Sequence, residues 1–455
     1  MSSQIAHTAS TLSEARMTLE RARERLLALQ HEGGWWRGEL QTNVTMDAED
    51  MLLREFLGIR RADGTERSAA WIRSQQRADG TWTNFHGGPG DLSTTIEAYW
   101  ALRLAGDEPE QEHMRIAAEF VREQGGIERA RVFTHVWLSL FGLWSWEQVP
   151  ALPPEIVLLP RWVALNIYDF ACWARQTIVA LSLVMAHRPC RSLPFDLDEL
   201  HGAEQWAPAP ATSARGRWLG RLDRALRLYE RHPIRPVRRL AMARAERWIV
   251  RRQEADGSWG GIQPPWVYSL MALSLRGYPL DHPAMRRGIG GIDTFMVQES
   301  GEDELGVGAP PGPSRRLEAC QSPVWDTALT AVALSDAGLP ADHPALVRAG
   351  EWLLGEEVTV GGDWCVARPA LAPGGWAFEF ANVNYPDVDD TAEVVLALRR
   401  IRVGAQARAR AAVERATAWT LGMQSTGGGW GAFDAENTRS LVRELPFLDF
   451  GEVID

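Results

Sequence analysis

Three aspartates crowd the start of an apolar run in the stretch Gly374–Leu398, which reads GGWAFEFANVNYPDVDDTAEVVLAL. Asp387, Asp389 and Asp390 follow a proline, so the spacing predicts that they lie in the first turn of a helix, where N-terminal N–H groups favour anions. Carboxylates this close together cannot all ionise cheaply, and at least one pKa is expected to rise. A carboxyl group that keeps its proton near neutral pH can act as an acid.

The residues alone leave three interpretations of this cluster open. The aspartates could do no more than cap a helix. Asp389, Asp390 and Glu393 also spell a DDxxE element, which suits Mg²⁺ and a diphosphate substrate. The third interpretation is a Brønsted acid, in which one aspartic acid gives its proton to a substrate.

Aromatic residues near the aspartates favour the acid. Protonating an alkene creates a carbocation, which water or a nucleophilic side chain would quench. A site for that chemistry needs apolar walls and ring faces, each of which stabilises a cation by roughly 0.5–2 kcal/mol. Taken alone, each ring is more often a core residue than a wall of a site. The rings available for the role are Trp376, Phe378, Tyr385, Trp325, Trp173 and Phe433.

The chain holds 21 tryptophans against 6 tyrosines, and many of the tryptophans recur in one pattern. In this unit Gly closes a helix, the indole covers the next helix, and a Gln amide can hydrogen-bond a neighbouring helix end. A looser copy, Glu351–Trp364, has Glu357 where the Gln would stand. Such repeats predict an all-α architecture of helix pairs. The four clear copies are QHEGGWW (Gln30–Trp36), QRADGTW (Gln76–Trp82), QEADGSW (Gln253–Trp259) and QSTGGGW (Gln424–Trp430).

Between the repeats the sequence shows helical apolar spacing and no sustained alternating strand pattern. The segment Arg217–Leu240 predicts a basic amphipathic helix, in which Trp218, Leu222 and Leu226 share an apolar face with Leu219 and Tyr229. Such a helix either packs on its own domain with a solvated arginine face or lies on an anionic membrane surface.

Composition excludes several other classes of function. A net charge of −11 and a pI near 5.5 argue against nucleic acid as a general partner. The N-terminus lacks the basic and apolar regions of a signal peptide, and the longest apolar runs fall short of the roughly 20 residues that cross a bilayer. No zinc site or disulfide framework is expected from the spacing of the cysteines, which are Cys172, Cys190, Cys320 and Cys365.

These pieces together resemble the squalene–hopene cyclase group of the terpene cyclase/mutase family. With the Gln–Trp repeats, the matching motifs cover nearly the whole chain, and the aspartate motif is highly specific for class II triterpene cyclisation. The motifs are GGWAFEFANVNYPDVDDTA (Gly374–Ala392), SPVWDTAL (Ser322–Leu329), GSWGGIQPPWVY (Gly257–Tyr268), LNIYDFACWAR (Leu165–Arg175), NVTMDAE (Asn43–Glu49), DLSTTIEAY (Asp91–Tyr99) and GGWGAFDAENT (Gly428–Thr438).

The resemblance implies a role for each of three groups of residues. Asp389 would protonate the terminal double bond of squalene, with Asp387 and Asp390 in support. Substrate binding and cation stabilisation would fall to Trp325, Phe378, Phe433, Trp173 and Tyr385. The waters that end the cascade would be ordered by Glu49, Glu97, Arg131 and Gln263. The implied product is a pentacyclic hopanoid, hopene or hopanol, and no metal or organic cofactor is implied.

The resemblance also implies a fold of two α/α barrels, one inserted in the other, with a nonpolar channel that opens at a membrane. We expect the inserted barrel at residues 40–295, and the outer barrel in the N-terminal helix (1–39) together with residues 296–455. The implied partners are squalene, the cytoplasmic surface of a membrane on which the protein would be monotopic, and a second copy in a homodimer.

Two departures from the family pattern bear on these expectations. The chain ends in LPFLDFGEVID, where family members continue with further helices and a histidine that hydrogen-bonds the catalytic aspartate. We therefore expect the isolated chain to be inactive or poorly folded, with an incomplete outer barrel and an exposed apolar seam. In Pro311–Cys320, Arg315 and Arg316 stand where relatives carry aromatic residues, which is expected to alter the cavity wall.

Two other functions compete with this expectation. One is a metal-dependent terpene enzyme that uses a prenyl diphosphate, which would need Mg²⁺ and lose activity in EDTA. The other is a non-catalytic helical-repeat fragment or pseudoenzyme, which would be indifferent to Asp389→Asn.

Overall fold

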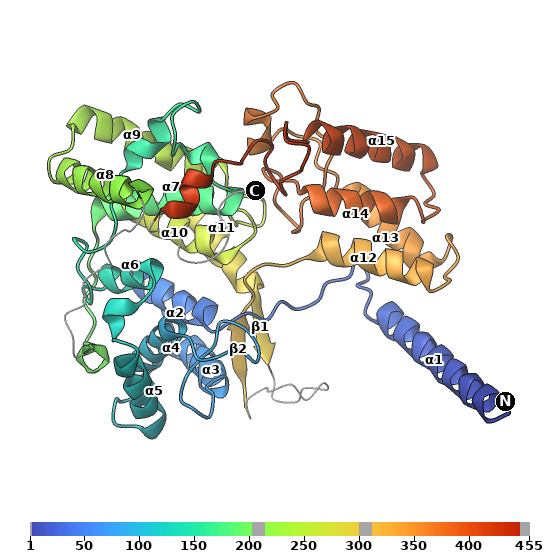
Figure 1. Cartoon of the computed structure of the whole chain (residues 1–455), viewed down its shortest axis with the longest axis horizontal. Helices are drawn as coiled ribbons and strands as arrows, with labels where there is room; N and C mark the ends of the chain where they lie inside the picture. The colour runs from blue at the N-terminus through green and yellow to red at the C-terminus, as the bar shows by residue number, and fades with distance from the viewer. Residues whose placement is uncertain (1, 203–213, 300–311, 446–455) are drawn as a thin grey trace. The chain divides into compact units, whose positions relative to one another are not determined.

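The computed structural model describes residues 2–202, 214–299 and 312–445, and within these ranges the chain is mostly helical (Figure 1). The prediction of a helical fold is therefore confirmed. Short 3₁₀ helices lie in the connections at Ile127–Arg129, Pro154–Leu158, Ile167–Asp169, Asp198–Leu200, Asp363–Val366 and Ser440–Glu444. The α-helices are α1 (Ser2–Ala28), α2 (Thr45–Leu57), α3 (Ala62–Ser74), α4 (Leu92–Ala105), α5 (Glu112–Glu123), α6 (Val132–Leu140), α7 (Cys172–His187), α8 (Ala214–Arg231), α9 (Arg235–Arg251), α10 (Gln263–Leu275), α11 (Pro283–Thr294), α12 (Pro323–Asp336), α13 (Pro344–Gly355), α14 (Val388–Leu398) and α15 (Gln406–Gly422).

One two-stranded sheet was not anticipated from the sequence. Strands β1 (Met296–Glu299) and β2 (Ser314–Leu317) pair antiparallel, with Met296 opposite Leu317. The backbone N–H of Leu317 donates a 2.7 Å hydrogen bond to the buried carboxyl of Asp47 in α2, which anchors the sheet. Strands of this length are too short to produce a recognisable alternation of apolar and polar residues.

The chain divides into two compact units. Unit 1 consists of residues 1–39, 321–436 and 455, and unit 2 of residues 40–320 and 437–454. Assignment of unit 2 to an inserted barrel and unit 1 to an outer one, with boundaries at residues 39 and 295, stays a prediction.

Unit 2 is built on helices that are apolar on most of their surface. Helix α4 packs against α2, α3 and α5, and α7 packs against α10. Eleven of the 14 residues of α4 and nearly all of α10 are buried, as expected for helices at the centre of a core. The side chain of Asp91 caps α4 by accepting the N–H of Thr94, and Gly106 ends it with a φ of 106°.

Unit 1 holds the aspartate motif. Helix α14 packs between α12 and α15. The segment after α1 is fixed to α12, because the N–H of Trp36 donates to Thr327 Oγ1 at 2.9 Å and the N–H of Gly38 donates to Asp326 Oδ2 at 2.8 Å.

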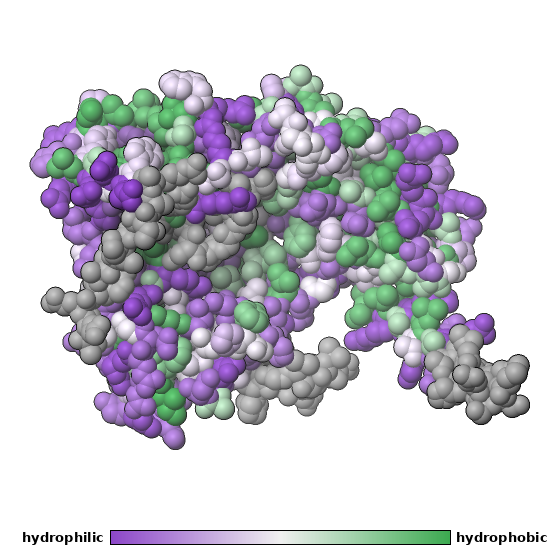
Figure 2. Space-filling model, in the orientation of Figure 1, coloured by the Kyte–Doolittle hydropathy of each residue, from purple (hydrophilic) through white to green (hydrophobic). Residues whose placement is uncertain are grey.

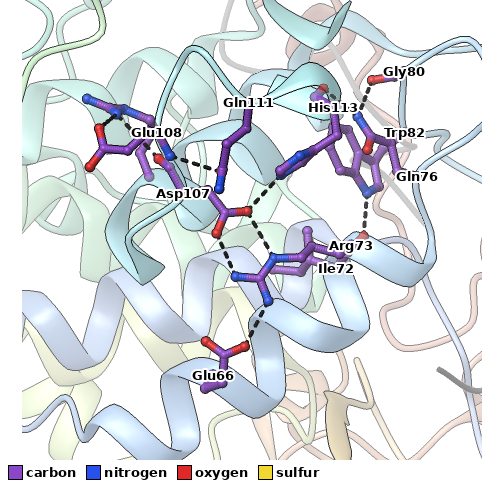
Figure 3. A network of polar contacts seen from close by, with 11 residues as sticks. Glu66, Ile72, Arg73, Gln76, Gly80, Trp82, Asp107, Glu108, Gln111 and His113 are labelled. Carbon is purple, nitrogen blue, oxygen red and sulfur yellow. Dashed lines mark hydrogen bonds and ion pairs between the residues drawn. The ribbon is translucent and has the colours of Figure 1, made fainter. Parts of the chain in front are cut away.

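Three Gln–Trp units join their own helix to the start of another helix, as the Gln amide of the unit predicted. In the unit Gln76–Trp82, the Gln76 amide donates to the carbonyl of Gly80 and to that of His113 in α5, both at 2.9 Å (Figure 3). The Trp82 indole N–H donates to the carbonyl of Ile72 in α3 at 2.7 Å. Beside this staple, Asp107 accepts two hydrogen bonds from Arg73, which ties α3 to the connection between α4 and α5.

The looser copy differs from the prediction in its tryptophan. The indole that donates to α13 belongs to Trp376, whose Nε1 lies 2.6 Å from the carbonyl of Leu353, whereas Trp364 packs edge-on against Trp419. Since a carboxylate has no N–H to donate, Glu357 instead accepts two hydrogen bonds from Arg415, each of 2.7 Å. The copy therefore runs to Trp376.

The predicted amphipathic helix Arg217–Leu240 is two helices. It breaks between Arg231 and Arg235 because Pro233 has no N–H for a continuous helix, and Pro236 then lies in the first turn of α9. The predicted apolar face is present, since Trp218, Leu222 and Leu226 of α8 line one cavity of about 370 Å³.

Candidate active site

Asp387 begins helix α14 as its N-cap. Its carboxylate accepts the N–H of Asp389 at 2.7 Å and that of Asp390 at 3.4 Å, while its own N–H donates to the carbonyl of Trp376 at 2.7 Å. The side chains of Asp387 and Asp390 are 6% and 1% exposed, whereas Asp389 is exposed in unit 1. The motif thus has one exposed carboxyl, that of Asp389, and two buried ones.

The buried carboxyls favour their protonated forms. Burial raises the pKa of Asp390 to about 9, with repulsion from Asp387 and then Glu379 adding to the shift. Burial also raises the pKa of Asp387 to about 7, and the N–H of Asp389 opposes that shift. Oδ1 of Asp390 is buried without a hydrogen-bond partner among the described residues. A proton is therefore retained at neutral pH one residue away from the exposed Asp389.

Glu379 is a site residue that the sequence interpretation did not single out. It is 7% exposed, accepts a 3.0 Å hydrogen bond from the Asn382 amide, and acts on the carboxyl of Asp390. The signal in the sequence was a lone acid between two rings, in the run Phe378, Glu379, Phe380. It adds a fourth carboxyl to the cluster.

Backbone hydrogen bonds bring three predicted rings to the aspartates within unit 1. Val388 donates to the carbonyl of Ala432 at 2.8 Å, which places Phe433 beside the start of α14. Val324 donates to the carbonyl of Phe378 at 3.4 Å, which joins that ring's segment to the start of α12 and Trp325. Phe433, Phe378 and Trp325 are all partly exposed, as a cavity wall requires.

Tyr385 lies in a different environment from these rings. It is 1% exposed, and its hydroxyl donates a 2.5 Å hydrogen bond to Asp363 Oδ2. In the described chain Tyr385 is a buried, hydrogen-bonded core ring, so its predicted contact with substrate has no support from this geometry.

A second polar cluster lies inside unit 2. The amide of Gln263 at the start of α10 donates to Glu49 Oε2 at 3.0 Å. Glu97 of α4 accepts the hydroxyl of Thr134, and Arg131 lies 3.6 Å from its other oxygen. The four residues predicted to order water all lie in unit 2. Glu49 is in α2, Glu97 in α4 and Gln263 in α10, and Arg131 directly precedes α6.

Charge and unmet hydrogen bonds distinguish this cluster from ordinary core. Burial and repulsion from Glu97 raise the pKa of Glu49 to about 8. Three atoms here, Glu97 Oε2, Gln263 Oε1 and the hydroxyl of Tyr268, are buried without a hydrogen-bond partner among the described residues. Buried polar atoms in that state are ordinarily satisfied by water. Tyr268 and Thr134 were not anticipated as members of the site.

Trp173 and the two arginines that depart from the family pattern are also in unit 2. Trp173 is partly exposed in the first turn of α7. Arg315 donates to Ser68 at 2.8 Å and lies 3.3 Å from Asp50, while Arg316 lies over the ring of Trp71. The arginines are thus held by α2 and α3 in an ion-paired cluster, and they supply no ring face.

Neither a metal site nor a membrane span is found in the described parts of the chain. Across residues 2–202, 214–299 and 312–445, no helix is long and apolar enough to cross a bilayer. Over the same ranges, no three His, Cys, Asp or Glu side chains are grouped so that they could hold a metal ion. The predicted C-terminal departure, LPFLDFGEVID, lies almost entirely outside the described residues.

Comparisons with known proteins find two matching family models and several similar proteins. The family model "Squalene-hopene cyclase N-terminal domain" matches residues 19–301, and "Squalene-hopene cyclase C-terminal domain" matches residues 321–455. A squalene–hopene cyclase of Alicyclobacillus acidocaldarius is 48% identical over 441 residues, which are 96% of this chain and 68% of that protein. A dammaradiene synthase of Dryopteris crassirhizoma is 35% identical over 98% of this chain and 64% of its own length. A squalene–hopene cyclase of Zymomonas mobilis is 35% identical over 96% of this chain and 67% of its own length.

The chain spans about two thirds of the length of these relatives. Both family models match in order along it and together cover most of its residues. This chain belongs to the squalene–hopene cyclase family.

Proposed function

We propose that this chain acts in the cyclisation of squalene to a pentacyclic hopanoid, with Asp389 as the proton donor. The observation that carries the proposal is the exposed carboxyl of Asp389 at the start of α14. The next residue, Asp390, is buried, and burial raises its pKa to about 9. Squalene–hopene cyclases among the relatives, 35–48% identical to this chain, support the substrate and the reaction.

The first step transfers a proton from the Asp389 carboxyl to the less substituted carbon of the terminal double bond. The π electrons form the new C–H bond and leave a tertiary cation, which the next double bond attacks to close a ring. Loss of a proton at the end restores the balance, so the overall reaction to hopene is an isomerisation. The protonated Asp390 and the cap residue Asp387 hold Asp389 in position and limit the negative charge around it.

The rings of Phe378, Phe433 and Trp325 are proposed to stabilise the early cations. Each is partly exposed near the start of α14 or α12, and each ring face is worth roughly 0.5–2 kcal/mol to a cation. Trp173 of unit 2 is proposed to contact the substrate as well. Tyr385 is proposed to act as a support for this wall, since its hydroxyl is bound to Asp363.

Termination is proposed to occur at the polar cluster of unit 2. Water held by Glu49, Glu97, Arg131 and Gln263 would accept the last proton or add a hydroxyl. The support is the set of buried polar atoms there that have no hydrogen-bond partner among the described residues and are suited to hold ordered water.

The proposal extends to a peripheral position on the cytoplasmic side of a membrane, where squalene resides, and to a homodimer. A cavity beside α8 is lined by apolar residues apart from Glu155, including Trp218, Leu222 and Phe170. Large apolar side chains are also exposed on and next to α8 and α9, namely Trp218, Leu228, Ile234 and Leu240. Figure 2 shows apolar and polar residues side by side in this region. This face fits an anionic lipid surface because arginines flank it. The homodimer rests on the family resemblance alone.

The test is incubation with squalene in detergent micelles, followed by analysis of the products. Two samples are needed: the chain alone, and the chain co-expressed with the part of the Alicyclobacillus relative that it does not match. A polycyclic product that forms in EDTA supports the proposal. Absence of any cyclised product from the second sample contradicts it, and a product that requires Mg²⁺ would favour the prenyl diphosphate alternative.

A further inference from the structure

A cavity of unit 2 that the proposed reaction does not use is lined mainly by charged side chains. It has a volume of about 160 Å³ and is formed by residues of α2, α3, α11 and β2 and of the connection between α2 and α3. Arginines outnumber aspartates in its walls. The charged residues of the lining are Arg54, Arg60, Arg61, Arg315, Asp63 and Asp293.

Two of these arginines are mostly buried and share one buried carboxylate. The side chains of Arg54 and Arg315 are 14% and 12% exposed, and both donate to Asp50, whose side chain is 1% exposed. The aspartates of the lining restore the balance only weakly. Asp63 and Asp293 have side chains that are 76% and 55% exposed, so water and salt screen their charges. The buried positive charge beside the cavity therefore exceeds the buried negative charge.

The protonation preferences of two residues agree with this excess. Burial lowers the pKa of Arg315, and the charge of Arg54 adds to that effect, although Asp50 opposes it. Burial also raises the pKa of Asp47, which interacts with Arg315, to about 8, so at neutral pH this carboxyl is largely protonated and supplies little negative charge. A buried guanidinium without a full counter-charge is stabilised when an anion binds beside it.

The first turn of α3 lies in the wall of the same cavity, beside Arg315. This helix has 13 residues, and the side chain of its N-cap residue, Arg61, makes no capping hydrogen bond. A Cβ added at Gly64, the third residue of the helix, would lie 3.0 Å from Nη1 of Arg315. Glycine thus lets the guanidinium approach the helix start. Because the first N–H groups of a helix have no partner within it, they and Arg315 can bind the same anion.

We propose that this cavity binds a phosphate or diphosphate anion through Arg54, Arg315 and the first turn of α3. Guanidinium groups bind phosphate oxygens through pairs of parallel N–H···O bonds, and the cavity has the volume of roughly five water molecules. A soluble ion and a lipid headgroup carry the same chemical group. The soluble ion fits better, because α8 and α9, which carry exposed apolar side chains, lie away from α3 and β2 (Figure 1).

The experiment is isothermal titration calorimetry of the full chain with sodium pyrophosphate and with inorganic phosphate, in the absence of squalene. The parent should bind one anion per chain, more weakly as the salt concentration rises. Gly64→Ala should weaken binding by about tenfold, because its methyl group displaces the guanidinium of Arg315, while alanine favours the helix. Asp293→Asn should tighten binding several-fold, because Asp293 accepts a 2.7 Å hydrogen bond from Arg54 and competes with the anion. Unfolding cannot produce that gain.

The matched control is Arg115→Gln in α5, where an exposed arginine pairs with Glu119. It removes the same charge as Arg315→Gln, but only Arg315→Gln should lose binding. Vesicles of phosphatidylcholine with phosphatidic acid test the lipid source, and the parent and Gly64→Ala should sediment with them equally. Loss of vesicle binding in Gly64→Ala alone would overturn the soluble source. Equal affinities of the parent, Gly64→Ala and Arg115→Gln for pyrophosphate, or no binding of either anion by the parent, overturn the proposal.

Discussion

The carboxylate of Asp387 accepts the backbone N–H of Asp389 at 2.7 Å, so one aspartate of the motif fixes the helix start that presents the next. The buried residue is thereby a structural cap and the exposed residue is free to meet a substrate. The two residues differ in this way because Asp387 is the N-cap of α14 and Asp389 lies in its first turn.

Asp387→Ala should lower the free energy of unfolding by about 1 kcal/mol, the usual value of an N-cap. Asp387→Ser should recover most of that loss, because a serine hydroxyl can accept the same N–H. Urea denaturation at pH 6 measures both variants. Equal destabilisation by the two would show that the cap contributes nothing.

Asp390→Asn should remove a pH dependence of stability. The pKa of Asp390 is raised to about 9 in the folded chain, so the folded state binds the proton more tightly than the unfolded state. Its contribution to stability is complete below about pH 4, the unfolded pKa, and is lost as the pH rises towards 9. The variant should therefore be more stable than the parent at pH 8, by at least about 1 kcal/mol.

The matched control for that variant is Asp336→Asn, at the exposed end of α12. Stability measured from pH 5 to pH 9 should fall for the parent and for this control, and fall less for Asp390→Asn. Parallel curves for all three chains would contradict a proton held at Asp390.

Glu49→Gln should act in the same direction in unit 2. Burial and Glu97 raise the pKa of Glu49 to about 8, so its contribution to stability is complete below about pH 4.5 and is lost as the pH rises towards 8. The glutamine variant should thus be more stable than the parent at pH 8 and nearly equal to it at pH 4.5. If the cluster holds the terminating water, the variant should also change the ratio of alcohol to alkene among the products, which gas chromatography measures.

Gln76→Ala and Gln424→Ala should differ in their cost to stability. The first removes two part-buried hydrogen bonds, one within its own turn and one to His113 of α5, worth about 1–3 kcal/mol together. The second removes one exposed bond within its own turn. Thermal unfolding of the two variants tests this. Equal losses would mean that the second bond of Gln76 contributes nothing.

Much of this organisation could be predicted from the sequence, because it follows from local patterns. The periodic Gln and Trp residues predict helix staples, and the Gln76 amide donates to the start of a neighbouring helix as predicted. The hydrogen bond of the Trp82 indole to the preceding helix was not predicted. The aspartate spacing predicts a helix start, and α14 begins there.

What the sequence could not show depends on distant contacts. The stapling indole of the looser copy is Trp376 and not Trp364, and Glu357 pairs with Arg415, which is remote in sequence. The role of Glu379 depends on burial beside Asp390, and the two short strands depend on the anchoring carboxyl of Asp47. Tyr385 was grouped with the substrate-binding rings because its type fits, but its hydroxyl is held in the core by Asp363.

The central claim, that Asp389 protonates squalene, is tested most directly by Asp389→Asn in the chain co-expressed with the unmatched part of its relative. An amide has nearly the same shape as the acid and cannot deliver a proton at neutral pH, so the rate of cyclisation should fall by about 10²–10⁴-fold while the fold is unchanged. Asp336→Asn serves as the control and should cyclise squalene at the parent rate. An Asp389→Asn rate equal to that of the control would contradict the account.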